Sequence, residues 1–254
     1  MLNRQKIKRI DNSKLLGNRI PAKQGETGLA RPKKALITRE TAVQAALEII
    51  EENGLSDFSL GAVARKMDVK SPSLYHHFQH KEDLLEEVAR EILSLARFAE
   101  DESADWETRT IQICLDTRKA LLRYPNAAPL ILQFFPRHLM LGAYERAVIG
   151  YPETRELHMA ILEAIEKLTY GSALFQAAAL ASGSPSMPAF DAKRYPNLAE
   201  SMAANPYDDE QIFLEALRTL ILGIRVRTDA MREDKPSIDT EYRGTDGRRA
   251  RPTR

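Results

Sequence analysis

The stretch Ser59–Phe78, SLGAVARKMDVKSPSLYHHF, decides how the N-terminal part of the chain folds. Its first half repeats apolar residues at the spacing i, i+3, i+4 and i+7, which is typical of one buried helix face. Those residues are Leu60, Val63, Ala64 and Met67. Asp68, Val69 and Lys70 then interrupt the period before a second helical pattern begins. Two short helices on either side of such a break indicate a helix-turn-helix.

The second helix of this stretch is expected to begin at Ser71-Pro72. Ser71 is the predicted N-cap because its side-chain oxygen can accept from an orphan backbone N–H. Pro72 suits the first helical position, which needs no donor. Leu74 and Phe78 are spaced to face the core. The outward face is then polar and aromatic, with Ser73, Tyr75, His76 and His77.

A bracing helix is predicted before this stretch and a longer helix after it. Thr38 is the expected N-cap of the first helix, and Asn53-Gly54 is its stop signal. Phe58 is expected to plug the base of the small bundle. Lys81 opens the later helix, whose buried positions continue to about Phe98.

The rest of the sequence favours helices only. No alternation typical of strands and no internal repeat is present, so an all-α chain is expected. A polar tail that we expect to be disordered follows the last helix. Apolar periods and proline breaks predict three long helices over residues 108–124, 155–181 and 208–230, a short helix over 197–204, and a broken apolar piece over 127–140.

Length and composition limit the classes of protein to which the chain can belong. With 254 residues and 43% hydrophobic content, it can bury a hydrophobic core, and we expect one small domain and one larger one. The formal net charge is only +1, yet residues 1–34 carry ten basic side chains against two acidic ones, Asp11 and Glu26. Such an arm is expected to be disordered alone and suits a polyanion. A solvated tail with no specific role is the alternative.

Enzymatic and membrane signals are weak. The chain has no phosphate-binding glycine loop, nucleophile elbow or HExxH motif, so we expect no catalytic residue, metal or cofactor. His76 and His80 have metal-ligand spacing, but no third ligand accompanies them. The lone Cys114 lies in an apolar pattern, which indicates a small buried side chain in a reducing compartment. No apolar run is long enough for a membrane span, so the expected location is cytoplasmic.

Residues 38–92 resemble the DNA-binding domain of the tetracycline-repressor (TetR) family. The run Val69–Phe78, VKSPSLYHHF, is similar to the family's turn and recognition helix, and Lys81–Leu85, KEDLL, is similar to the start of its fourth helix. Weaker similarity continues in Ala120–Tyr124, ALLRY, and between Tyr195 and Gly223. The resemblance implies an all-α fold, with an N-terminal three-helix DNA-binding domain followed by a larger helical ligand-binding and dimerisation domain.

The resemblance also implies a division of the chain. The expected parts are a disordered basic arm over residues 1–35, a helix-turn-helix DNA-binding domain over 36–84, a ligand-binding and dimerisation domain over 85–231, and a disordered tail over 232–254.

The resemblance further implies that a set of polar side chains meets DNA. Serine hydroxyls can donate to phosphates or bases, and a tyrosine or a lysine can reach phosphates. A partly buried Tyr75 that braces the first helix is the alternative for that residue. Where relatives often carry a threonine and an arginine, this chain has Leu60 and Gly61, so we hypothesise that the basic arm supplies the missing attraction. The expected DNA contacts are Ser71, Pro72, Ser73, Tyr75, His76, His77 and Lys81.

On the ligand side, the resemblance implies contact positions at Arg97, Thr117 and Ile131. Ile131 stands where tetracycline repressors use a histidine for drug-bound magnesium, so a magnesium–tetracycline complex is not expected. The apolar, proline-broken segment with Phe134, Phe135 and His138 is expected to line a pocket for a lipophilic molecule. Plain core packing of these residues is the alternative.

The resulting expectation is a homodimeric transcriptional regulator that binds a palindromic double-stranded DNA operator. A small-molecule effector would release it by biasing the helix that begins at Lys81. In this family repression is commoner than activation, and the long helices near residues 155–181 and 208–230 form the dimer interface. The alternatives are a helical ligand-binding protein or enzyme that uses the bundle as scaffold, and an architectural DNA binder without sequence preference.

Overall fold

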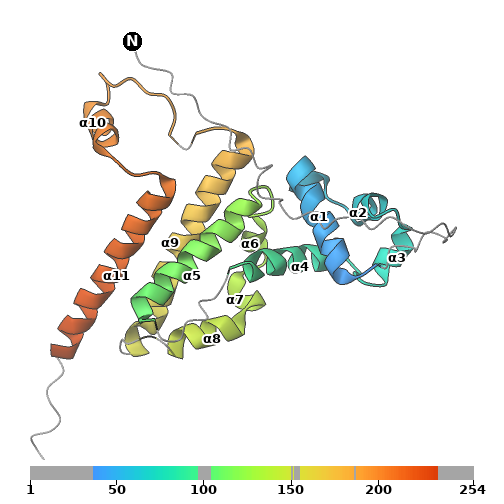
Figure 1. Ribbon diagram of the computed structural model, residues 1–254, viewed down its shortest axis with the longest axis horizontal. Helices are drawn as coiled ribbons and strands as arrows, with labels where there is room; N and C mark the ends of the chain where they lie inside the picture. Colours follow the sequence, from blue (N-terminus) through green and yellow to red (C-terminus); the bar gives the residue numbers. More distant parts are fainter. Residues whose placement is uncertain (1–36, 97–103, 150, 152–154, 186, 234–254) are drawn as a thin grey trace, which may run out of the picture. The chain divides into compact units, whose positions relative to one another are not determined.

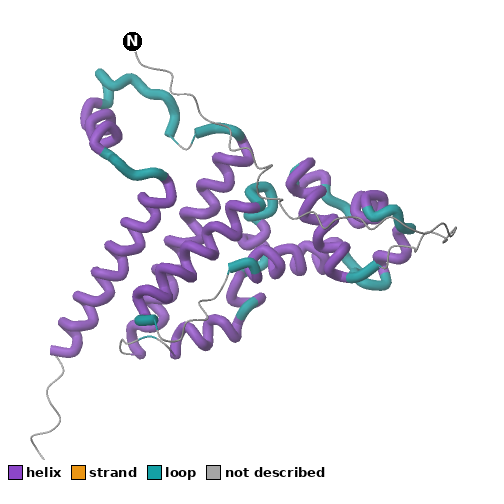
Figure 2. Tube along the Cα trace, in the orientation of Figure 1, coloured by secondary structure: helices purple, strands orange, loops and turns teal. Residues whose placement is uncertain are grey.

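The computed structural model describes residues 37–96, 104–149, 151, 155–185 and 187–233. These residues form helices and loops without a strand, which confirms the all-α fold class (Figure 1 and Figure 2). The predicted arm over residues 1–35 lies outside the described residues. The predicted tail does too, except that residues 232 and 233 continue the last helix.

The first part of the described chain is a bundle around the predicted helix-turn-helix. α1 and α4 pack against each other, and α2 packs on both α1 and α3. The ends of α1 follow the sequence signals, because Thr38 Oγ1 accepts from the Thr41 N–H at 3.2 Å and Gly54 ends the helix with a φ of 82°. The elements are α1 (Arg39–Asn53), the 3-10 turn η2 (Leu55–Asp57), α2 (Leu60–Lys66), α3 (Ser71–Tyr75) and α4 (Lys81–Ser94).

The second part of the chain is built on the pairing of its first helix, α5, with the long helix α9. α11 packs on both of them, and α4 contacts α5, α6 and α7. No helix among the described residues is long and apolar enough to cross a membrane. The helices are α5 (Trp106–Arg123), α6 (Leu130–Gln133), α7 (Pro136–Leu139), α8 (Leu141–Ile149), α9 (Arg155–Ser182), α10 (Pro196–Ala204) and α11 (Asp209–Glu233).

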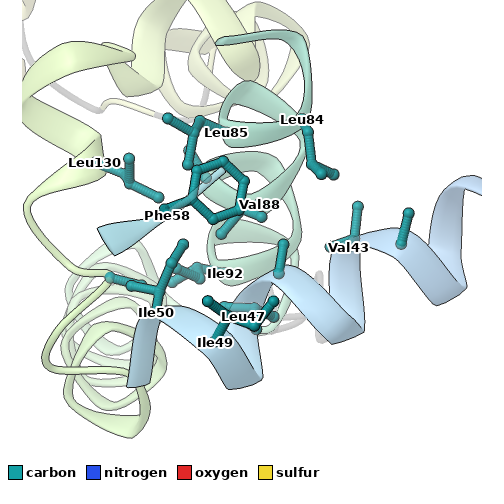
Figure 3. Packing of buried hydrophobic residues seen from close by; sticks show 14 of the residues in the cluster. Val43, Leu47, Ile49, Ile50, Phe58, Leu84, Leu85, Val88, Ile92 and Leu130 are labelled. Carbon is teal, nitrogen blue, oxygen red and sulfur yellow. The ribbon is translucent and has the colours of Figure 1, made fainter. Parts of the chain in front are cut away.

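One hydrophobic core joins the two parts. Figure 3 shows Phe58, from the loop before α2, among Leu85 and Val88 of α4 and Leu130 of α6. All four side chains are buried, and the same cluster reaches Ala173 and other residues of α9. Because each such burial contributes ~1.5–3 kcal/mol, the helices of the two parts hold each other in place. Phe58 is buried, but it packs in the core shared by both parts of the chain and not only inside the small bundle for which it was predicted.

The turn of the helix-turn-helix is a backbone motif that ends α2. Asp68 has a φ of 54° and is the only non-glycine with positive φ among the described residues. Its own N–H donates to Arg65 O at 3.1 Å, and the Val69 N–H donates to Ala64 O at 3.0 Å. This pair of bonds is the Schellman arrangement, in which the left-handed residue reverses the chain. Aspartate tolerates that conformation better than most side chains do.

Three details differ from the sequence prediction. Ser71 is not the N-cap of α3, since Lys70 has extended dihedrals and its carbonyl accepts the first helical bond from Ser73 at 2.9 Å. Ser71 is therefore the first helical residue and Pro72 the second. α4 ends at Ser94 rather than near Phe98, with Leu95 as its C-cap. α8 has no counterpart in the sequence prediction.

Replacing Asp68 tests the turn. Asp68→Val places a β-branched side chain at positive φ and should lower the free energy of unfolding by ~1–2 kcal/mol. Asp68→Gly removes that strain but raises the conformational entropy of the unfolded chain. The two effects oppose each other, so its free energy of unfolding should stay within ~0.5 kcal/mol of that of the parent. Urea unfolding of both variants measures the difference, with Gln79→Val as a control at an exposed position of ordinary φ. Equal stability of the valine and glycine variants would show that the turn does not depend on this conformation.

Candidate functional site

α3, the second helix of the predicted helix-turn-helix, has polar side chains at the surface and buried apolar anchors on it and just after it. Leu74 and Phe78 are 0% exposed, as their spacing predicts. Tyr75 is 54% exposed, so part of its ring is open to solvent. Of the other predicted contacts on this helix and just after it, Ser71, Pro72 and His76 are exposed, and Ser73 and His77 are half-buried.

The start of α4 carries the last of the predicted DNA contacts. Lys81 is exposed and is the first helical residue, and the Asp83 carboxylate fixes the helix start by accepting from the His80 N–H at 2.9 Å. All seven predicted DNA contacts therefore lie in one short segment and none of them is buried. His76 caps the end of α3 whereas His80 caps the start of α4, so the two histidines do not share a helix. Within the described ranges, no group of three or more His, Cys, Asp or Glu could hold a metal ion.

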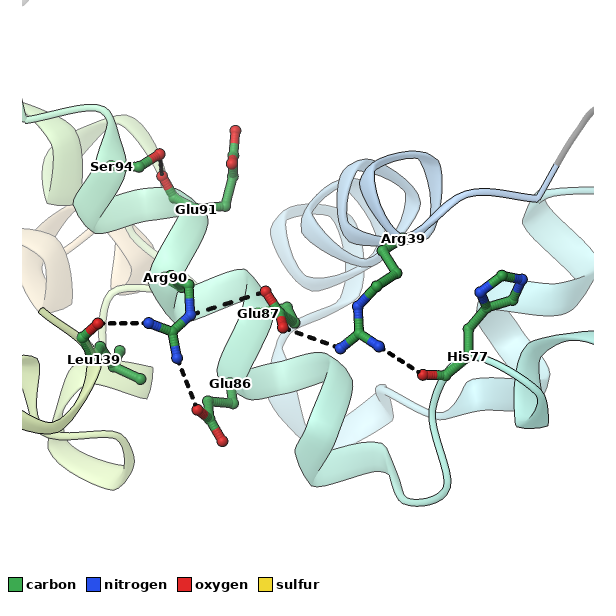
Figure 4. A network of polar contacts seen from close by, with 8 residues as sticks. All are labelled: Arg39, His77, Glu86, Glu87, Arg90, Glu91, Ser94 and Leu139. Carbon is green, nitrogen blue, oxygen red and sulfur yellow. Dashed lines mark hydrogen bonds and ion pairs between the residues drawn. The ribbon is translucent and has the colours of Figure 1, made fainter.

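Arg39 is a residue of this site that the sequence analysis missed. Its Nη1 donates to the carbonyl oxygen of His77 and its Nη2 donates to Glu87 Oε1, each at 3.0 Å (Figure 4). Its guanidinium also lies 4.7 Å from the centre of the Phe78 ring. Arg39 thus ties α1 to the end of α3 and to α4. The sequence does contain one sign of this role. Arg39 is a cation in the first turn of a helix, where the helix dipole disfavours positive charge unless another interaction compensates.

Charged contacts also connect α4 with the second part of the chain. Arg90 Nη1 donates to the carbonyl oxygen of Leu139 in α7, and Nη2 pairs with Glu86 at 3.0 Å. Arg90 Nε lies 3.9 Å from Glu87, the carboxylate that Arg39 also contacts (Figure 4). A continuous series of polar contacts therefore runs from α1 through α4 to α7.

A second polar contact fixes the end of α1 to the turn before α6. Asn126 Nδ2 donates to the carbonyl oxygen of Glu51 at 2.9 Å, and the Ala127 N–H donates to Glu51 Oε1 at 3.0 Å. Partial burial raises the pKa of Glu51, and its hydrogen bonds with Ala127 and Asn126 offset part of that effect. The bundle of α1, α2, α3 and α4, which we call the recognition bundle, is therefore held to the segment around α6 and α7 at two separated points.

The predicted ligand positions do not share one environment. Thr117 and Ile131 are buried, and Phe134 is half-buried. Phe135 and His138 are exposed and meet edge to face, with ring centres 6.0 Å apart. Arg97 lies outside the described residues. The segment therefore combines interior residues with an aromatic pair at the surface.

A polar cluster next to this segment was not predicted from the sequence. Tyr144 of α8 donates to Glu166 Oε1 at 2.7 Å, and Arg137 of α7 contacts both Glu166 and Glu163. Burial is the main cause that raises the pKa of Tyr144 and of Tyr170, so both phenols are protonated at neutral pH. The cluster draws on three helices, and no pattern within one helix could have assembled it.

Cys114 belongs to the interior and not to a reactive site. It packs with Phe213, Leu217 and Ile221 of α11. Burial raises the pKa of its thiol to about 11, so the uncharged form prevails at neutral pH. The prediction of a small buried side chain is confirmed.

Known proteins share both the recognition bundle and the second part of the chain. Residues 42–88 match the model of the family described as bacterial regulatory proteins, tetR family. The chain is 30% identical over 204 residues to the tetracycline repressor protein class D of Escherichia coli, which covers 78% of this chain and 93% of that protein. The class H repressor of Photobacterium damsela subsp. piscicida gives the same identity and coverage.

Solved structures of the same family resemble this chain in fold. A possible TetR family transcriptional regulator from Streptomyces coelicolor A3(2) has a TM-score of 0.62 and 28% identity, covering 75% of this chain and 100% of its own. TetR from Acinetobacter baumannii AYE has a TM-score of 0.61 and 25% identity, covering 76% of this chain and 98% of its own. A variant of the latter protein is solved in complex with minocycline. The chain therefore belongs to the tetR family of bacterial regulatory proteins and is a transcriptional regulator.

Proposed function

We propose that the chain binds a palindromic DNA operator as a homodimer and that a small lipophilic molecule releases it. Residues 36–84 then form the DNA-binding domain and residues 85–231 the ligand-binding and dimerisation domain. The observation that carries this proposal is the exposed polar face of α3 above the buried anchors Leu74 and Phe78. We assign the chain a regulatory and not a catalytic role, and its relatives are transcriptional regulators.

The operator contacts follow from the chemistry of that face. Ser71, Pro72 and Ser73 stand in the first turn of α3, where a recognition helix meets base edges. Tyr75, His76, His77 and Lys81 stand further along and are suited to phosphates. Base contacts select a sequence, whereas phosphate contacts set affinity and its salt dependence. The two groups of residues should therefore respond differently to mutation.

Lys81→Gln tests the phosphate role. Loss of one phosphate contact per protomer should weaken operator binding at every sequence alike, and should reduce the slope of log K against log salt by about 1 per protomer. Gel-shift titrations at several salt concentrations provide the slope, with Lys193→Gln as a control at an exposed lysine far along the chain. A slope equal to that of the parent would remove Lys81 from the interface.

The proposed dimer interface is the apolar groove between α9 and α11. It has a volume of about 780 Å³ and is lined mainly by small and aliphatic side chains, among them Ala164, Leu168, Leu220 and Gly223. Beside it, the outer face of α11 exposes large apolar groups such as Val226, which is 62% exposed. Small residues allow close approach of helices, so two copies can pair α9 and α11 as a four-helix bundle. Such pairing would hold two recognition helices about one DNA turn, roughly 34–36 Å, apart.

Gly223→Arg should separate the two protomers. A Cβ at Gly223 meets nothing within 4 Å in the single chain, so the protomer accommodates a side chain there. In the dimer the same side chain would occupy the groove, and we expect a mass of one chain by light scattering together with loss of operator binding. Gly142→Arg is the control, because a Cβ there meets only the flexible Arg146 side chain. A Gly223→Arg variant that remains dimeric would place the interface elsewhere.

The proposed effector acts where α6 and α7 meet α4. Ile131 gives the segment an apolar interior position in place of a magnesium-coordinating side chain, and Phe134 and Phe135 add aromatic surface. A ligand that repacks this segment would shift Leu139, whose carbonyl oxygen accepts from Arg90. Since Arg90 and Arg39 both contact Glu87, the shift would reach the end of α3. The ligand can do so only if it binds the released state more tightly than the DNA-bound state.

Arg90→Gln should weaken this coupling. The compounds to use are lipophilic molecules selected for releasing operator DNA from the parent protein. For such a compound the variant should keep its affinity within about twofold, yet half-release of DNA should need a roughly fivefold higher concentration, a coupling loss of about 1 kcal/mol. Calorimetry gives the affinity and fluorescence anisotropy of labelled operator gives the release.

Glu91→Gln is the control for this experiment, because it changes a neighbouring charge on the same helix. Unchanged release by Arg90→Gln would exclude this route of coupling. Failure of every lipophilic compound to release the parent protein from DNA would contradict the effector class itself.

A further inference from the structure

A second hollow lies on the opposite flank of α11 from the dimer groove. It is lined by residues at the start of α5 and by residues of α11 between Arg218 and Arg232. The start of α5 and the end of α11 are the lower ends of these two helices in Figure 1. Its volume is about 720 Å³, which is within the range of pockets that hold small molecules. None of the residues that line it lines the groove proposed for the dimer.

Two polar groups at this hollow are buried and have no hydrogen-bond partner within the part of the chain that the structure describes. They are the indole N–H of Trp106 and the hydroxyl of Thr228, whose residue is only 2% exposed. Buried polar groups in proteins nearly always have a partner, so two such groups at one site call for a further molecule. The indole can only donate, and a hydroxyl can donate as well. The missing partner is therefore an acceptor, such as an oxygen atom.

The charges of the site also favour an acceptor. Arg218 and Arg225 lie seven residues apart on the same face of α11 and line the hollow. Arg225 Nη2 is paired with Glu107 across the hollow, and Arg218 Nη1 is 2.5 Å from Glu215. One carboxylate cannot satisfy the five N–H groups of a guanidinium, so donors remain on both arginines.

The carboxylate of Asp105, just before α5, already accepts hydrogen bonds within the chain. Asp105 caps the helix, because its two carboxylate oxygens accept from the N–H and the hydroxyl of Thr108, each at 2.9 Å. These hydrogen bonds keep the pKa of Asp105 below its usual range, so it stays ionised and committed to the cap. The N-terminal end of α5 adds the positive end of a helix dipole. The remaining carboxylate of the lining, Asp229, lies 3.6 Å from Arg232. An anion is thus opposed only by carboxylates that have partners of their own.

The remaining wall is apolar. Ile111 contributes an aliphatic surface, and the Trp106 ring is held edge to face against Tyr151 with centres 5.8 Å apart. A ligand that fits this wall has a flat or compact apolar body. We propose that the hollow is a binding site for an aromatic carboxylate, whose ring lies against Trp106 and Ile111 and whose carboxylate meets Arg218 and Arg225. One of its oxygens takes the hydrogen bonds that Trp106 and Thr228 lack, once the side chains that cover these two donors have moved aside.

The probe for this site is 4-tert-butylbenzoate, with the uncharged 4-tert-butylbenzamide as its matched comparison. Calorimetry on the full chain should give one site per chain with a dissociation constant below about 1 mM, and the amide should bind at least about fivefold more weakly. Trp106 is the only tryptophan of the sequence, so its fluorescence reports directly on occupancy of the hollow. The benzoate should change this fluorescence with the same dissociation constant.

Two variants test which side chains contact the carboxylate of the benzoate. Arg218→Gln and Thr228→Val should each weaken benzoate binding about three- to tenfold, because each removes a donor. Arg123→Gln, at an exposed arginine near the other end of α5, should leave it unchanged. Arg218 is exposed, so its variant tests the site even if replacement of the buried Thr228 impairs folding.

Three outcomes would overturn the proposal. The first is no heat and no fluorescence change at about 10 mM benzoate, the result expected if the hollow holds only water. The second is equal affinity for the acid and the amide. The third is equal weakening by Arg218→Gln and Arg123→Gln, which would indicate nonspecific attraction. Neither the operator nor the effector enters the experiment, so its failure leaves the proposed function intact.

Discussion

The burial of α4 against both α1 and the segment around α6 is the constraint on which the rest of the structure depends. Val88 and Ile92 are 0% exposed, and α4 contacts helices on both sides of it along its length. Packed interiors of this kind have discrete arrangements and do not deform continuously. In the proposed coupling, a change in the packing of α6 or α7 would move α4 as a unit, and with it the bundle that carries α3.

The polar contacts around α4 have a different role from the core. Glu87 and Arg39 are partly exposed, and ion pairs of this kind contribute about 0.2–1 kcal/mol each. They cannot provide the stability that the buried side chains provide. They link helices, because Arg39 of α1 donates both to the His77 carbonyl and to Glu87 of α4. The core holds the helices together, and these contacts connect the end of α3 to its neighbours.

Features that depend on neighbours in sequence were predictable. The two helices of the motif, the caps at Thr38 and Gly54, and the burial of Leu74 and Phe78 all follow from local spacing and turn chemistry. Features that depend on distant neighbours were not. The Tyr144–Glu166 contact joins residues of two helices, so no pattern within one helix predicts it.

Ser71 was wrongly predicted as the N-cap of α3, and the cause is the turn that precedes the helix. A serine followed by proline satisfies the rules for an N-cap, yet the preceding turn had already set where the helix begins. Asp68 in the left-handed conformation places Lys70 so that its carbonyl accepts the first bond from Ser73. The turn at Asp68 therefore outweighs the N-cap preference of Ser71. The Ser71 side chain remains exposed on the outward face.

Under these proposals α11 has three roles, each on a different face of the helix. Its 3.6-residue period separates a buried face with Leu217 and Ile221, a groove face with Leu220 and Gly223, and an arginine face with Arg218 and Arg225. The faces share one rigid body, so a ligand on the arginine face and a second chain on the groove face would bind to the same helix. If either binding event changed the affinity of the other, linkage would require the same factor in the reverse direction. The dimer and the hollow would then form one coupled system, separate from the route through α4.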